Sequence, residues 1–71
     1  MNDTKFKQLF DSAGDYEVST IQASYEAVAF ETMVFGSGDW SGFQQRYATE
    51  AEAVAGHGRI VEKIKAGEKP E

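Results

Sequence analysis

The most apolar run of the chain, residues 28–35, alternates in a way that predicts a central β-strand ending at Gly36. Because successive side chains of a strand point to opposite faces, the run divides into two sets. The first set is Val28, Phe30, Thr32 and Val34, and the second is Ala29, Glu31, Met33 and Phe35. Its β-branched and aromatic residues also favour the extended conformation. Both faces of this strand are largely apolar, so each of them needs a cover.

A helix over residues 19–35 is the competing interpretation of the same region. Ser19 and Gln22 would form its capping box. Apolar or small residues near helical spacing would form its buried stripe, at Ile21, Tyr25, Val28, Ala29, Thr32 and Met33. The alternation and the β-branched content favour the strand.

Two shorter segments predict the neighbours of the central strand. Asp15–Ala23 contains the extended-favouring run from Val18 to Ile21, although the link that follows it carries no Gly, Asn or Pro to form a tight turn. Residues 36–42 contain three glycines and predict a loop. Gln44–Ala48 then predicts a short third strand.

Two amphipathic segments flank this sheet. Residues 3–13 place Phe6, Leu9 and Phe10 on one face at helical spacing, with Asp3 as N-cap and Gly14 as the stop, so a short helix is predicted.

The C-terminal helix carries clearer signals. Thr49 and Glu52 have the spacing of a capping box, and Lys63 and Lys65 suit the negative end of a helix that Gly67 closes. Its predicted buried stripe is Ala53, Val54, His57, Ile60, Val61 and Ile64.

These elements predict one small α+β domain spanning residues 1–71. A short N-terminal helix in 1–14 precedes a three-stranded antiparallel meander in 15–48, and the amphipathic helix in 49–67 packs on one face before a tail at 68–71. A chain of this length buries only about 60% of its unfolded surface. It contains no cysteine, so oligomerisation is the remaining way to add stability.

The second face of the sheet therefore has two candidate covers. The N-terminal helix could fold over it through Phe6 and Phe10, or a second copy could pack against Met33 and Phe35 as a symmetric homodimer.

The net charge of −5, from twelve acidic and seven basic residues, argues against direct nucleic-acid binding. No apolar run approaches the roughly 20 residues of a membrane span, and the N-terminus lacks a signal-peptide apolar region. We therefore expect no membrane partner and a cytoplasmic location, which the absence of cysteine also suits.

His57 is the only histidine and lies within the apolar stripe of the C-terminal helix, between Gly56 and Gly58. The structural interpretation is a helix packed closely on the sheet, with a histidine at the core edge bonded to a carbonyl or carboxylate. The functional interpretation is a pH-sensitive or ligand-contacting residue. No metal is expected, because one histidine and scattered carboxylates lack ligand spacing.

Glu31 lies between apolar neighbours on the central strand, and a cross-strand pair with Arg46 would explain it. Arg46 and Tyr47 should lie on opposite faces of the third strand.

The loop after the central strand carries the candidate partner-binding residues Trp40, Phe43 and Asp39. Trp40 and Phe43 either fold back over a sheet edge as a lid or form an exposed aromatic anchor. Gly36–Gly38 is not a phosphate loop, because no Gly-Lys-Ser/Thr follows and Asp39 would repel phosphate.

Several motifs together resemble a set of small uncharacterised proteins from tailed bacteriophages and prophages. The resemblance covers about residues 18–57 and implies a phage or prophage origin, but no activity or catalytic residue. Proteins of that set often have a longer loop between their first strands, and residues 1–14 have no counterpart. The motifs are Val18-Ser19-Thr20, Phe30-Glu31-Thr32-Met33-Val34-Phe35-Gly36, Arg46-Tyr47-Ala48-Thr49-Glu50-Ala51-Glu52-Ala53 and Gly56-His57.

We therefore expect a small accessory protein, encoded by a phage or prophage and located in the host cytoplasm, that binds a host or phage protein without catalysis. One alternative is an inhibitor that uses an acidic surface against a host DNA-binding or defence enzyme. Another is a small ligand-binding domain or enzyme that uses His57 with Glu31 and Arg46. No cofactor is expected.

Overall fold

The central strand occupies the residues that the alternation predicts. The computed structural model describes residues 8–24 and 28–70, without the side chains of Ser24 and Val28. In it, β3 runs from Val28 to Phe35 and is paired on both sides. Phe30, Thr32 and Val34 are buried on one face, so a helix over residues 19–35 is excluded.

The sheet is an antiparallel meander in the order β1-β2-β3-β4. Besides β3 it contains β1 (Leu9–Ala13), β2 (Tyr16–Ser24) and β4 (Gln44–Tyr47). The α+β class is therefore confirmed, but the sheet has four strands where the sequence predicts three. The predicted strands on either side of the central one, Asp15–Ala23 and Gln44–Ala48, match β2 and β4 within one residue at each end.

The additional strand replaces the predicted N-terminal helix, which is wrong over Leu9–Ala13. Ala13 pairs with Tyr16, so Gly14 and Asp15 form a two-residue hairpin rather than a helix end. Gly14 has φ +59, the left-handed conformation that a tight hairpin places on its first central residue. Pairing with β2 satisfies the backbone hydrogen bonds of this segment, whereas an isolated helix of this length would not be stable in water. Phe6 and the start of the predicted helix lie outside the described residues.

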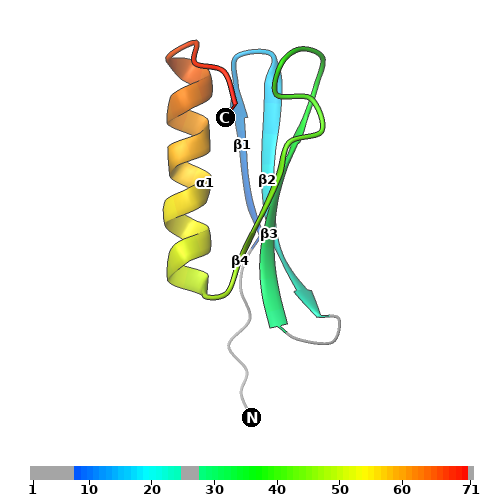
Figure 1. The fold of residues 1–71 in the computed structure, drawn as a ribbon, viewed down its shortest axis with the longest axis vertical. Coiled ribbons are helices and arrows are strands. Elements are labelled where there is room, and N and C mark those ends of the chain that lie inside the picture. The colour runs from blue at the N-terminus through cyan, green and yellow to red at the C-terminus, as the bar shows by residue number, and fades with distance from the viewer. Residues whose placement is uncertain (1–7, 25–27, 71) are drawn as a thin grey trace.

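The single helix of the described region, α1, runs from Glu50 to Lys65 along one face of the sheet (Figure 1). Thr49 accepts a hydrogen bond from the Glu52 amide at 3.1 Å, and Glu52 accepts one from the Ala48 amide at 3.2 Å. The capping box is thus confirmed, with Glu52 bonded to the amide of Ala48 rather than to that of the N-cap residue Thr49. Gly67 ends the helix, since its amide and that of Glu68 donate to carbonyls of the last turn.

The core lies between α1 and the sheet in two apolar clusters. The larger cluster gathers around Val18, Val34 and Ile60, and the smaller one comprises Phe30, Tyr47 and Ala53. The predicted helical stripe holds except at Val54, which is 49% exposed, whereas Gly56 is buried. Val54 faces solvent because the side of α1 that carries Gly56 is the side that contacts the sheet.

Candidate functional site

A chain of polar side chains crosses the core between the two apolar clusters. The His57 Nε2 lies 2.7 Å from Asp11 Oδ2, and the His57 Nδ1 lies 2.7 Å from Thr20 Oγ1. Thr20 is in turn hydrogen-bonded to Thr32 on the neighbouring strand. These four residues come from β1, β2, β3 and α1, so the chain ties the helix to three strands. A buried ring with both nitrogens paired avoids the cost of an unsatisfied polar group.

The order carboxylate, imidazole and hydroxyl is also that of a nucleophilic triad. Here the hydroxyl is inaccessible, because Thr20 and Thr32 are both 0% exposed and His57 is 4% exposed. A nucleophile must touch its substrate, and Thr20 has no surface on which a substrate could lie. The geometry therefore favours the structural interpretation of His57. The sequence could not indicate its partners, because it predicts a helix over residues 3–13, which include Asp11.

Glu31 and Arg46 face each other across β3 and β4, as the sequence predicts. The Arg46 Nε lies 3.5 Å from Glu31 Oε2, and Glu31 is 7% exposed while most of the Arg46 side chain is in solvent. The pair neutralises a carboxylate that its neighbours largely cover. His57 lies on the other side of the sheet, so the structure does not bring it together with this pair.

The sheet face turned away from α1 is the exposed apolar surface of the described region. We call it the open face, and its exposed apolar side chains are Phe10 (53% exposed), Phe35 (49%) and Ile21 (37%). Met33 is half-buried on the same face, two positions from Glu31 along β3. In Figure 1, α1 lies on the opposite side of the sheet, and no described element covers this one. The prediction that both faces of β3 are largely apolar is thus confirmed.

Met33 and Phe35 lie on the open face, as predicted. Phe10, predicted to cover this face from a helix, is instead part of it on β1, and Ile21 is an additional member. Phe10 and Met33 flank Ser19 in neighbouring strands, and their bulk leaves Ser19 8% exposed. Ser19 accepts a hydrogen bond from Gln8 Nε2 at 2.9 Å. Ile21 could have been found from its alternation with Val18 and Thr20 along β2.

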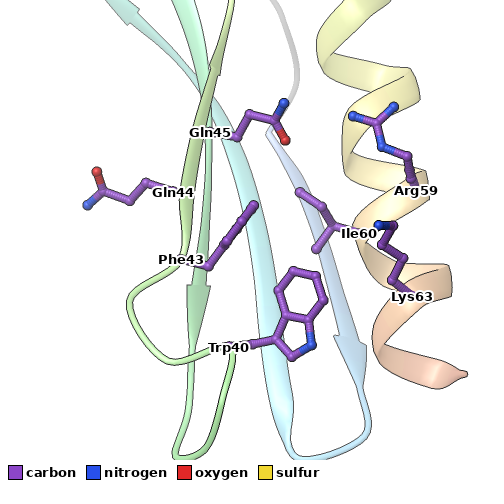
Figure 2. A pocket seen from close by; sticks show the side chains of 7 residues that line it. All are labelled: Trp40, Phe43, Gln44, Gln45, Arg59, Ile60 and Lys63. Carbon is purple, nitrogen blue, oxygen red and sulfur yellow. The ribbon is translucent and has the colours of Figure 1, made fainter. Parts of the chain in front are cut away.

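Trp40 is not an exposed anchor. It is 3% exposed, and its indole Nε1 donates a 2.7 Å hydrogen bond to the carbonyl of Glu68. Its ring meets Phe43 edge-on at 5.0 Å between centroids. Figure 2 shows both rings directed inward toward Ile60, in the lid arrangement, while Asp39 is exposed.

Comparison with known proteins adds no identity: no family model, curated protein or solved structure matches this chain. In the part of the chain that the structure describes, α1 lacks the length and apolarity needed to cross a membrane. The same part brings no three His, Asp or Glu side chains together as a metal-binding group.

Proposed function

We propose that this protein is a small accessory protein of a phage or prophage that binds another protein through the open face, without catalysis. The single observation that carries the binding role is the exposure of Phe10, Phe35 and Ile21 on one sheet face while α1 covers the other. Contiguous exposed apolar side chains are uncommon on monomers and mark interaction surfaces. The sequence motifs shared with small phage proteins support the origin.

The charge around the open face indicates the chemistry of the partner. Glu17 lies opposite Phe35 in the register and is exposed on the same face. The whole chain carries a net charge of −5. Electrostatic complementarity guides encounter and excludes partners of like charge. The partner therefore presents an apolar surface rimmed by basic groups, on a host or phage protein.

The geometry of the polar chain supports the proposal that the protein acts without catalysis. Its hydroxyls lie in the core, and the Glu31–Arg46 pair lies on the other side of the sheet from His57. No described acid, base and nucleophile converge on an accessible cleft, which is what general acid–base chemistry needs.

The test compares Phe35→Glu with Val54→Glu. Both residues are 49% exposed, but Val54 lies on α1 away from the open face. A host protein captured in stoichiometric amount by the wild type and by Val54→Glu, and lost with Phe35→Glu, supports the proposal. Circular dichroism confirms that both variants fold.

Two outcomes contradict it. One is a partner that Phe35→Glu retains, which would place the contact elsewhere. The other is a dimer in light scattering that Phe35→Glu dissociates, because the open face would then be occupied by a second copy of the chain.

A further inference from the structure

A groove between β4 and α1 forms a second surface, separate from the open face. Its first hollow, of about 240 Å³, is lined by Phe43 and Gln45 on one side and by Arg59, Ile60 and Lys63 on the other. Figure 2 shows Phe43 and Ile60 between the strand and the helix, with Gln45 above them and Arg59 and Lys63 beside them on α1.

The groove continues along the strand. A second hollow, of about 360 Å³, shares Gln45 and Arg59 with the first and extends to Tyr47 and Ala55. The two hollows therefore adjoin and follow β4 over its length. A ligand that fills both is elongated rather than compact.

The strand beside the groove is an edge strand. β4 is the last strand of the order β1-β2-β3-β4 and pairs with β3 on one side only, among the residues that the structure describes. An edge strand presents a row of main-chain donors and acceptors that a further strand can pair with. Grooves between an edge strand and a helix bind extended peptides in this way.

The charge of the groove is opposite to that of the whole chain. Arg59 and Lys63 lie one helical turn apart on α1 and both line the first hollow. Arg46 of β4 lines the second hollow and is paired with Glu31. Arg59 is exposed and forms no ion pair with any described residue. The carboxylate in the lining, Glu52, is hydrogen-bonded to the Ala48 amide. An acidic protein thus carries a local basic surface beside its edge strand.

We propose that this groove binds an extended acidic peptide segment of a partner protein, which adds to β4 as a further strand. Alternate side chains of such a strand point to the two faces of the sheet. Those on the α1 side meet Arg59, Lys63 and Gln45, and those on the other side meet Arg46. This site goes beyond the proposed function, since it uses the edge of β4 and the groove beside α1 rather than the exposed side chains of Phe10, Phe35 and Ile21.

Single-stranded nucleic acid is the other anionic polymer that a basic groove could attract. Binding of that kind relies on aromatic faces on which bases stack. The indole of Trp40 is 3% exposed and hydrogen-bonded at Nε1, so it offers no such face. The edge strand and the buried aromatics favour the peptide.

The test titrates the protein with a synthetic peptide of alternating Val and Glu, capped at both ends and about seven residues long, enough for one strand. Trp40 is the only tryptophan and lines the first hollow, so its fluorescence reports binding, with calorimetry as a second readout. We expect saturable binding that weakens as salt rises. A Val–Lys peptide, and a Val–Glu peptide N-methylated at alternate amides, should bind at least about tenfold more weakly.

Matched variants locate the site. Arg59→Glu should weaken binding by about tenfold, because an attraction becomes a repulsion. Lys65→Glu makes the same charge change on α1 outside the groove lining and should leave affinity within about twofold. Phe35→Glu should also leave it unchanged, so that failure here is distinct from failure of the proposed function.

Four results overturn the proposal. They are no heat or fluorescence change with the Val–Glu peptide, equal binding of the Val–Lys peptide, an equal loss in Arg59→Glu and Lys65→Glu, and tighter binding of an oligothymidine than of the peptide. Circular dichroism of each variant separates misfolding from loss of the site.

Discussion

Gly56 and Gly58 lie on the same helix, but the structure predicts opposite effects when each is replaced by alanine. Alanine is favoured over glycine in a helix interior by about 1 kcal/mol. Gly58 is exposed, and an added Cβ there has no neighbour within 4 Å. We therefore expect Gly58→Ala to raise the free energy of unfolding by about 1 kcal/mol.

At Gly56 the added methyl group meets the ring of Tyr47. Its Cβ would lie 2.5 Å from Tyr47 Cζ, and closer still to Cε1 and the hydroxyl oxygen. Tyr47 is 8% exposed, so the whole ring would have to move within the core. Inserting a methyl group into a packed core costs about 1–3 kcal/mol. The gain in helix propensity, about 1 kcal/mol, offsets part of this cost. Gly56→Ala should therefore lower the free energy of unfolding by up to about 2 kcal/mol.

The assay is urea denaturation followed by the fluorescence of Trp40, which is buried in the native state. Thermal unfolding by circular dichroism gives a second value, in which 1 kcal/mol corresponds to about 4–8 °C for a domain of this size. Gly58→Ala should melt above the wild type and Gly56→Ala below it. If Gly56→Ala were as stable as Gly58→Ala, the close contact between α1 and β4 would be wrong.

Three further predictions concern the cap and the core. Thr49→Ala should lower the free energy of unfolding by about 1 kcal/mol, and Thr49→Asp should not, since an aspartate also caps; an unchanged urea midpoint in the alanine variant would contradict the cap. Tyr47→Phe should be neutral or stabilising, because the buried hydroxyl has no partner among the described residues; a clear loss of thermal stability would argue otherwise. Thr20→Val should cost about 1–3 kcal/mol in urea denaturation by leaving His57 and Thr32 without their shared hydroxyl, whereas Thr20→Ser should cost less; equal losses would mean that packing matters more than the hydrogen bonds.

The clearest sequence predictions concern features that depend on near neighbours. The bounds of β3 follow from an alternation within eight residues, and the start of α1 follows from a cap that spans Thr49 to Glu52. The Glu31–Arg46 pair was also predictable, because a glutamate amid apolar neighbours needs a cation on the adjacent strand.

The N-terminal segment shows where local pattern misleads. Phe6, Leu9 and Phe10 have helical spacing, yet Leu9–Ala13 forms a strand. A strand is stabilised by pairing with a neighbouring strand. The neighbour here is β2, which lies beside β1 only because the chain reverses direction at Gly14. In the strand, alternation places Phe10 on the open face and Ala13 in the core on the opposite face. In a helix, residues three positions apart would lie on the same face.

The sequence by itself determined the central strand, the cap and end of α1, and the two-sided apolar character of β3, because each depends on residues within a few positions. Tertiary structure alone decided the burial of Trp40, the contact of Gly56 with Tyr47 and the polar chain from Asp11 through His57 to Thr32. Asp11 and His57 are 46 positions apart. Contacts of this kind follow from how the helix rests on the sheet, and no periodicity in the chain encodes that placement.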